Sequence, residues 1–126
     1  MSTAKDFKIK NVTISTNGHK ELYFDIELEG NVNQDYYELR LFNSNRECIE
    51  CYAYPSSGER ITIKSIFLDL KPKEENIRIF YLELGVAEYT DKGEEIKWKM
   101  LSAYKPIEVN IYYETHIFRK SVMEIR

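Results

Sequence analysis

The chain is short of the residue types on which small proteins most often build chemistry. Its 126 residues include two cysteines, two histidines, five glycines and three prolines. The scattered glycines form no phosphate-binding loop, and His19 and His116 have no partner at the spacing of metal ligands. These absences argue against a nucleotide-dependent enzyme and against a zinc protein, so we expect neither a cofactor nor a bound metal.

An excess of charge of one sign is also lacking. The net charge is −3, the pI is about 5.5, and acids and bases are interleaved along the chain. A surface that tracks phosphates needs a basic stripe, so nucleic acid is not an expected partner. No apolar run reaches the length of a membrane span, and the N-terminal stretch MSTAKDFKIKNVTIS lacks the apolar core of a secretion signal. We expect a cytoplasmic protein, although a secreted protein without its signal would look the same.

What the chain does have is a strong alternation of apolar and polar residues. In ELYFDIELE, residues 21–29, one face carries Leu22, Phe24, Ile26 and Leu28, and the other face is polar. A period of two residues is typical of a β-strand that is packed on one side and hydrated on the other. Aromatics reach 13% of the residues, with ten tyrosines, which suits such half-buried surfaces.

Further alternating or apolar stretches follow, separated by polar turns, and no convincing helix precedes residue 114. In one stretch the apolar parity switches near Lys64-Ser65, which predicts a bulge or a bend. Short strands joined by turns favour an all-β antiparallel sandwich. The predicted strands cover residues 21–29, 36–42, 47–54, 60–70, 77–89, 95–101 and 107–113.

Two segments resemble the fibronectin type III family and related immunoglobulin-like domains. SIFLDLKPKEENIRIFYLEL is similar to the corner at which a strand of that family ends in Leu-x-Pro, matched here by residues 70–72. The tyrosine that the family places a few residues later is missing at positions 76 and 77. SAYKPIEV, residues 102–109, is similar to the interrupted last strand of the family. The resemblance implies a seven-stranded antiparallel immunoglobulin-like (fibronectin type III-like) sandwich, and it implies no particular function.

We expect one domain over residues 1–114, followed by a C-terminal tail over residues 115–126. In the tail, Phe118, Val122 and Ile125 have the spacing of one helical face, but the segment is short and has no capping signal. The tail either docks on the sandwich or binds a partner.

Both cysteines lie in one predicted strand, as Cys48-Ile49-Glu50-Cys51. Residues three apart in a regular strand point to opposite faces, so we expect the two thiols to diverge. Cys51, aligned with Ile49, is then expected in the core, and Cys48 on the other face. A redox pair needs a helix N-terminus, and a zinc site needs further ligands. The favoured interpretation is two reduced, idle thiols.

Aromatic residues are the better candidates for a binding surface. Strict alternation turns the side chains of a small set outward on neighbouring strands, and tyrosine offers a large contact area with few rotatable bonds. Alternatively, these rings are ordinary sheet covering. The candidate partner-binding residues are Tyr23, Tyr36, Phe42, Tyr52 and Tyr54 on the strands, and Phe118, Val122 and Ile125 in the tail.

The resulting hypothesis is a non-catalytic module that binds another protein or a second copy of itself. No acid–base pair or activated nucleophile is evident, so we do not expect an enzyme. The residue composition suggests a bacterial or phage accessory or structural component. One alternative is a sandwich that binds carbohydrate or another small ligand, with Trp98 stacking on sugar rings. A second alternative is a small metal-binding or redox protein that uses Cys48 and Cys51.

Overall fold

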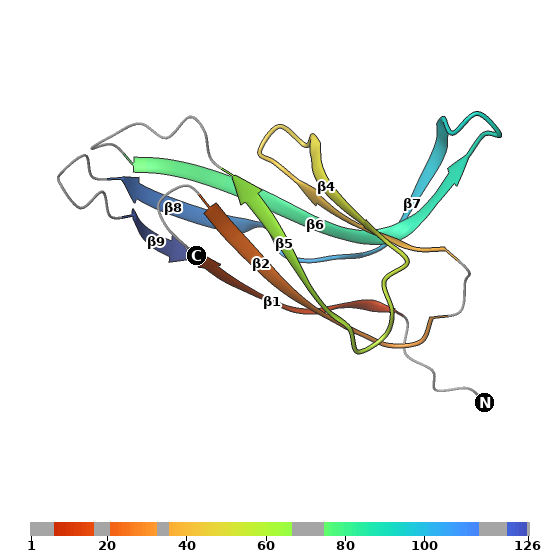
Figure 1. Cartoon of the computed structure of the whole chain (residues 1–126), viewed down its shortest axis with the longest axis horizontal. Coiled ribbons are helices and arrows are strands. Elements are labelled where there is room, and N and C mark those ends of the chain that lie inside the picture. The colour runs from red at the N-terminus through yellow and green to blue at the C-terminus, as the bar shows by residue number, and fades with distance from the viewer. Residues whose placement is uncertain (1–6, 17–20, 33–35, 67–74, 114–120, 126) are drawn as a thin grey trace.

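The computed structural model describes residues 7–16, 21–32, 36–66, 75–113 and 121–125. Within these ranges the chain is all-β, contains no helix, and forms two antiparallel sheets (Figure 1). Its nine strands in the described residues are β1 (Lys8–Thr16), β2 (Glu21–Glu29), β3 (Glu38–Phe42), β4 (Cys48–Ala53), β5 (Arg60–Ile66), β6 (Glu75–Tyr89), β7 (Glu95–Ala103), β8 (Ile107–Tyr113) and β9 (Ser121–Ile125).

The two sheets differ in size. The smaller sheet has the order β1-β2-β5, and the larger sheet has the order β4-β3-β6-β8-β9, with β7 also paired to β6. Every pair of neighbouring strands is antiparallel. The two layers lie face to face over most of their length (Figure 1). The architecture is therefore compatible with the β-sandwich expected from the alternation.

The longest strand, β6, organises the larger sheet. Its residues 81–85 pair with β3 on one side, and residues 83–89 pair with β7 on the other. Residues 75–80 pair with β8. Between β7 and β8, the Tyr104 amide still donates to the Leu82 carbonyl of β6 (3.0 Å). β7 and β8 thus run along one edge of β6 as a single strand interrupted at residues 104–106.

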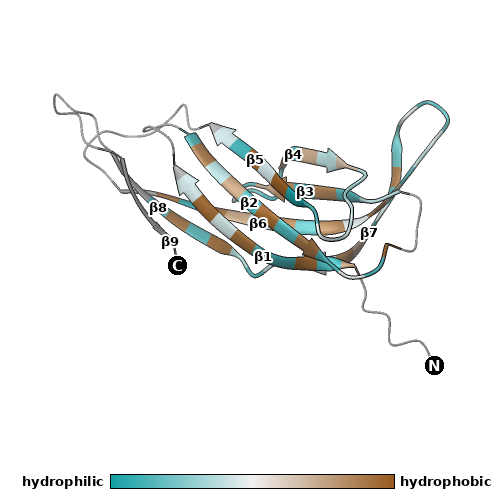
Figure 2. Cartoon of the chain, turned by 60° about the horizontal axis from the view of Figure 1, so that its bottom comes forward, coloured by the Kyte–Doolittle hydropathy of each residue, from teal (hydrophilic) through white to brown (hydrophobic). Residues whose placement is uncertain are grey.

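The core lies between the sheets and follows from the alternation. In β2 the exposed fractions of Leu22, Phe24, Ile26 and Leu28 are 1% or less. The intervening residues of β2 are all half-buried, and hydrophobic and hydrophilic bands alternate along the strands (Figure 2). Full burial of one such side chain contributes roughly 1.5–3 kcal/mol to folding. This contribution fixes which face of β2 turns inward, because a shift by one residue would expose the whole set.

Aromatic rings join the two layers directly. Phe24 of β2 meets Phe80 of β6 edge-to-face, with ring centroids 4.9 Å apart. Phe7, just before β1, meets Tyr37, just before β3, at the same separation. Such edge-to-face pairs add about 1 kcal/mol beyond the area that they bury. One contiguous core cluster therefore spans both sheets.

The expected count of seven strands is not confirmed, because β1 and β9 are present as well. Alternation did not reveal β1, since its apolar residues change parity between Ile9 and Val12. The register of β1 against β2 shifts between Ile9 and Asn11, and this bulge lets both Ile9 and Ile14 be buried. A strand with a bulge does not keep a strict period of two along its length, so this periodicity does not reveal it.

Two further expectations need correction. Of the bulge or bend predicted near Lys64-Ser65, the bulge is wrong, because β5 pairs with β2 without a register shift through Ile66, and Ser65 continues the buried face. The bend stays a prediction. The helical spacing in the tail is also misleading, because residues 121–125 form β9, paired with β8. Phe118 lies outside the described residues, and of Val122 and Ile125 only the strand pairing is described.

Candidate functional site

The outer face of the larger sheet, turned away from the smaller sheet, carries the most organised group of polar and aromatic side chains. Leu39 and Leu41 of β3 are fully buried between the sheets, so the alternate residues Glu38 and Arg40 face outward. We call the following residues the outer-face cluster: Tyr36, Glu38, Arg40, Cys51, Tyr54, Tyr89, Glu95 and Trp98.

Glu38 is the centre of the outer-face cluster. Its exposed fraction is only 1%, although its strand position faces outward. One carboxylate oxygen, Oε2, accepts hydrogen bonds from the hydroxyls of Tyr36 and Tyr89. The other, Oε1, accepts from Arg40 Nε (2.9 Å) and from the Cys51 thiol (3.2 Å). Both oxygens are therefore satisfied, as a buried carboxylate requires.

The protonation state of Glu38 follows from these bonds. Burial by itself raises the pKa of a carboxyl group, because the charged form loses its hydration. The hydrogen bonds from Tyr36, Tyr89, Cys51 and Arg40 outweigh burial and lower the pKa of Glu38 to about 2. Burial and the bond to Glu38 raise the pKa of Tyr36, and the bond to Glu38 also raises the pKa of Tyr89. At neutral pH the cluster holds a carboxylate and two neutral phenols, so none of these groups is poised to transfer a proton.

Arg40 connects Glu38 to β7. Its guanidinium forms ion pairs with Glu38 (2.8 Å) and with Glu95. It also stacks on the ring of Trp98, with the guanidinium carbon 3.8 Å from the ring centroid. A guanidinium is suited to both contacts, because it is planar and donates several hydrogen bonds in one plane. Burial lowers the pKa of Arg40, but the bonds to Glu95 and Glu38 raise it overall.

Strand β6 supports the Trp98 ring on its sheet side. The ring nitrogen donates to Glu83 Oε1 (2.8 Å). A Cβ at Gly85 would lie 2.4 Å from the Lys99 carbonyl oxygen and 2.8 Å from the indole ring, so only glycine leaves room for the ring on β6. The indole therefore has Gly85 against it on the sheet side and Arg40 stacked on it.

Tyrosine rings form the exposed part of the outer-face cluster. Tyr36 meets Tyr54 edge-to-face at 4.9 Å between centroids, and Tyr89 at 6.3 Å. The exposed fractions of Tyr54 and Tyr89 are 68% and 43%, so both rings present apolar area to solvent. Met100, opposite Gly85 in the register of β7, extends this surface with an exposed fraction of 51%. The result is an aromatic surface supported by a buried charge network.

The structure brings only some of the predicted binding residues together. Tyr36 and Tyr54 belong to the outer-face cluster. Tyr23 lies on β2 of the smaller sheet, where its hydroxyl bonds Glu21 (2.6 Å). Phe42 is half-buried at the end of β3, opposite Cys48. Tyr52 pairs with the inward-facing Leu39 and donates to Glu59 (2.7 Å), away from the cluster.

Other members of the outer-face cluster were missed or assigned another role. Tyr89 was not singled out, although its place on β6 faces outward, and Trp98 was considered only as a sugar-stacking ring. Glu38 and Arg40 had a detectable signal, because they are two charged residues alternating with buried leucines in YYELRLF. The signal does not reveal that the carboxylate is buried, which depends on covering groups from β4, β6 and β7.

The prediction that the two thiols diverge is wrong. The register of β3 against β4 shifts between Leu41 and Phe42, so that Cys48 pairs with Phe42 and Cys51 with Arg40. The extra residue, Ile49, forms a bulge and turns both cysteines to the outer face. Cys51 is also exposed rather than a core residue.

The thiols are poorly suited to nucleophilic or redox chemistry. Partial burial and the hydrogen bond to Glu38 raise the pKa of Cys51 to about 12, and partial burial raises the pKa of Cys48. A reactive cysteine requires the opposite shift, because the thiolate is the nucleophile. Within the described ranges, no three side chains of His, Cys, Asp or Glu gather as a metal site.

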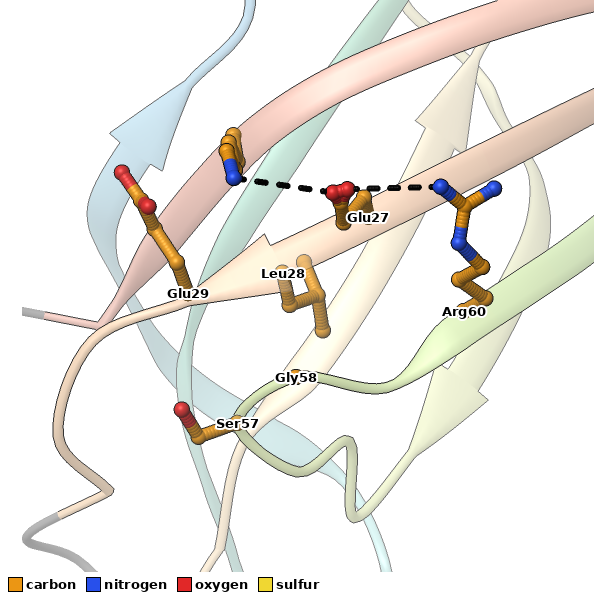
Figure 3. Close-up of a pocket in the computed structure, with 7 residues that line it drawn as sticks. Glu27, Leu28, Glu29, Ser57, Gly58 and Arg60 are labelled. Carbon is orange, nitrogen blue, oxygen red and sulfur yellow. Dashed lines mark ion pairs between the residues drawn. The ribbon is translucent and has the colours of Figure 1, made fainter.

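A separate hollow lies on the smaller sheet near the turn before β5 (Figure 3). It has a volume of about 410 Å³ and contains no aromatic ring. Glu27 forms ion pairs with Lys10 (3.8 Å) and Arg60 (3.5 Å), and Glu29 pairs with Lys8 (3.4 Å). Because these charges are already paired with one another, the hollow does not favour a charged ligand. Its lining residues are Lys10, Glu27, Leu28, Glu29, Ser57, Gly58 and Arg60.

Comparison with protein-family models, with characterised proteins and with solved structures produced no match to this chain. The described part of the chain has no helix with the length and apolar character that crossing a membrane requires.

Proposed function

We propose that the protein is a non-catalytic interaction module that binds another protein through the outer-face cluster. The observation that carries this proposal is the arrangement around Glu38, whose carboxylate binds Tyr36, Tyr89, Arg40 and Cys51 from three different strands and the segment before β3. Side chains that are already fixed lose little conformational entropy when a partner covers them. Tyrosine, tryptophan and arginine are also the residues that most often dominate binding energies at protein interfaces.

The electrostatics support binding rather than catalysis. General acid–base catalysis requires a group whose pKa lies near the working pH. In the outer-face cluster the shifts move pKa values away from neutrality, down for Glu38 and up for Tyr36, Tyr89 and Cys51. These directions favour a permanent charge network with a structural role.

An immunoglobulin-like, fibronectin type III-like topology is part of this proposal. In such sandwiches the first, second and fifth strands in sequence (A, B and E) share one sheet, and the strands named C, F and G share the other. Here β1, β2 and β5 form one sheet, and β3, β6 and the interrupted strand β7–β8 lie together in the other. This strand order supports the proposed relationship, and β9 is then an addition at the edge.

The environment of Trp98 disfavours a carbohydrate site. The ring lies on the outer face of the larger sheet, but Arg40 stacks on it and Gly85 lies against it. A sugar ring would have to displace the guanidinium from two carboxylates, Glu38 and Glu95. The cytoplasmic location and the bacterial or phage origin stay predictions.

Photo-crosslinking in the native host tests the proposed function. A photoreactive phenylalanine analogue replaces Tyr54 in one variant and Tyr23 in the control variant, which places the same group on the outer face of the smaller sheet. We expect a discrete crosslinked protein from position 54 and none from position 23. Combining the position-54 analogue with Glu38→Gln should greatly reduce the amount of this crosslinked product, because the charged carboxylate that holds Tyr36 and Tyr89 in place is removed.

Equal crosslinking from positions 23 and 54 would show that the outer-face cluster is not a specific binding surface. Absence of any product from position 54 in cells that express the protein at its normal level would also contradict the proposal.

A further inference from the structure

Strand β7 presents an open edge beyond the body of the sandwich. The hairpin of β6 and β7 curves away from the two layers (Figure 1). In β7, every residue is exposed except Trp98 and Ser102, which are half-buried, so neither face of the strand is covered. β1 approaches only at the far end, where the Ile9 amide donates to Ser102 Oγ (3.2 Å). Among the described residues, the free edge is therefore the stretch 95–101.

The two faces of this edge strand differ in chemistry. Trp98 and Met100 pair with Ala87 and Gly85 and lie on the outer face. Lys97 and Lys99 pair with Glu88 and Val86 and lie on the opposite face. Both lysines are exposed. No ion pair of the described residues includes either of them.

The lysines oppose pairing between two copies of the chain in registers centred on the middle of this edge. Two copies of one strand pair antiparallel about a two-fold axis, so the same residues approach each other. A pairing centred on Lys97, Trp98 or Lys99 places a lysine of one copy opposite a lysine of the other. Like charges directly opposite each other are destabilising, and lysines are a common means of blocking self-association at sheet edges.

We propose that the free edge of β7 binds an extended strand of another protein in which acidic residues alternate with apolar ones. The acidic residues lie opposite Lys97 and Lys99, and the apolar residue between them lies opposite Trp98. Backbone hydrogen bonds supply general affinity for an added strand, and the alternating side chains supply the selection. This site shares Glu95 and Trp98 with the outer-face cluster. It binds through the backbone edge of β7, however, and does not require the rings of Tyr36 and Tyr54, so a Tyr54 variant separates it from the function proposed above.

Short synthetic peptides test this proposal with the intact protein. One peptide alternates glutamate and valine, and the other alternates lysine and valine. Trp98, the one tryptophan of the chain, reports binding by its fluorescence, and amide hydrogen exchange reports whether residues 95–101 become protected. We expect the glutamate peptide to bind, to protect β7, and to lose affinity as the salt concentration rises, while the lysine peptide does not bind.

A charge exchange provides the decisive variant. The double variant Lys97→Glu, Lys99→Glu should lower the affinity for the glutamate peptide by roughly tenfold or more, and it should allow the lysine peptide to bind. The matched control combines Lys64→Glu on β5 with Lys92→Glu in the β6–β7 turn, two exposed lysines outside the stretch 95–101, and should keep the parent preference for the glutamate peptide. Tyr54→Ala should also keep the preference for the glutamate peptide.

The proposal is overturned if the parent protein binds neither peptide, binds both equally, or binds the glutamate peptide without protecting β7. An unchanged preference in the Lys97→Glu, Lys99→Glu variant overturns it too. The peptide comparison on the parent protein decides the matter even if a variant folds poorly.

Discussion

Glu38 shows how one residue can organise a surface. In the described residues it is the one charged side chain among the buried residues, and it binds groups from β3, β4, β6 and the segment before β3. A buried carboxylate with all its acceptor positions used is stabilising only as long as the complete set of donors is present. The positions of Tyr36, Tyr89 and Arg40 therefore depend on one negative charge.

Replacing Glu38 by glutamine removes this charge while keeping the size of the side chain. We expect Glu38→Gln to lower the free energy of unfolding at neutral pH by about 3 kcal/mol, since Arg40 loses its buried counter-charge and one of the two acceptor oxygens becomes an NH2 donor. Urea unfolding measures the change. Glu94→Gln, in the exposed turn before β7, is the matched control and should change stability by less than about 0.5 kcal/mol.

The stability difference between the parent and Glu38→Gln should depend on pH in one direction. The pKa of Glu38 is lowered from the ordinary value of 4.5 to about 2, so the folded protein binds this proton less readily than the unfolded chain does. The stability that the carboxylate contributes is fully present above pH 4.5 and is lost as the pH falls through about 2. The difference in unfolding free energy between the parent and Glu38→Gln should therefore shrink between these values. A difference that grows on acidification would contradict the assigned charge.

At the scale of one element, β2 shows why alternation is reliable in a two-layer protein. Its even-numbered residues are buried against the other sheet, while its odd-numbered residues lie beside charged neighbours on the outer face. β4 and β1 show the opposite case. In each of them a bulge adds one residue, and every side chain beyond it changes face.

Adjacent substitutions in β2 test this division of faces. We expect Phe24→Ala to lower the free energy of unfolding by about 3–5 kcal/mol, because it removes the ring that contacts Phe80 and leaves a cavity. Tyr23→Ala, one residue earlier, should cost less than about 1 kcal/mol because its ring is only half-buried. Chemical denaturation of both variants measures the difference. Equal losses would mean that the assigned faces of β2 are wrong.

At the scale of the whole molecule, the larger sheet continues through β9. Residues 121–125 add a strand beside β8, which would otherwise be an edge strand in this part of the sheet. An exposed edge offers unpaired backbone groups to other chains. The tail proposed as a docking or partner-binding segment thus supplies at least one strand of its own sheet.

A chain that ends at Tyr113 tests what this strand contributes. Removing residues 114–126 should lower the melting temperature by roughly 5 °C, because the backbone hydrogen bonds between β8 and β9 are lost. It should also cause self-association that increases with protein concentration, because β8 becomes an open edge. Differential scanning calorimetry and analytical ultracentrifugation measure the two effects. An equally stable and monodisperse shortened chain would show that β9 contributes little to the fold.

Much of the secondary structure was predictable, while the candidate site was predictable only in part. A strand is present at each of the seven predicted positions, and in β2 the burial of one face explains the period-two pattern, whereas β4 and β7 are largely exposed on both faces. Tyr36 and Tyr54 were identified from the same pattern. Tyr23 does not lie with them because its strand belongs to the smaller sheet. Tyr52 lies on β4 beside β3, but it pairs with the inward-facing Leu39, because the bulge in β4 breaks the alternation from which its face was predicted.

The sequence by itself determined an all-β protein, and for β2 also which face is buried, because alternation is a local property of neighbouring residues. Tertiary structure alone decided which outward side chains meet. Glu38 and Tyr89 are 51 positions apart, and Arg40 and Glu95 are 55 positions apart, yet they share one hydrogen-bonded cluster. Contacts of this kind depend on strand order, register and bulges, which are set by the packing of the whole sheet and leave no periodic trace along the chain.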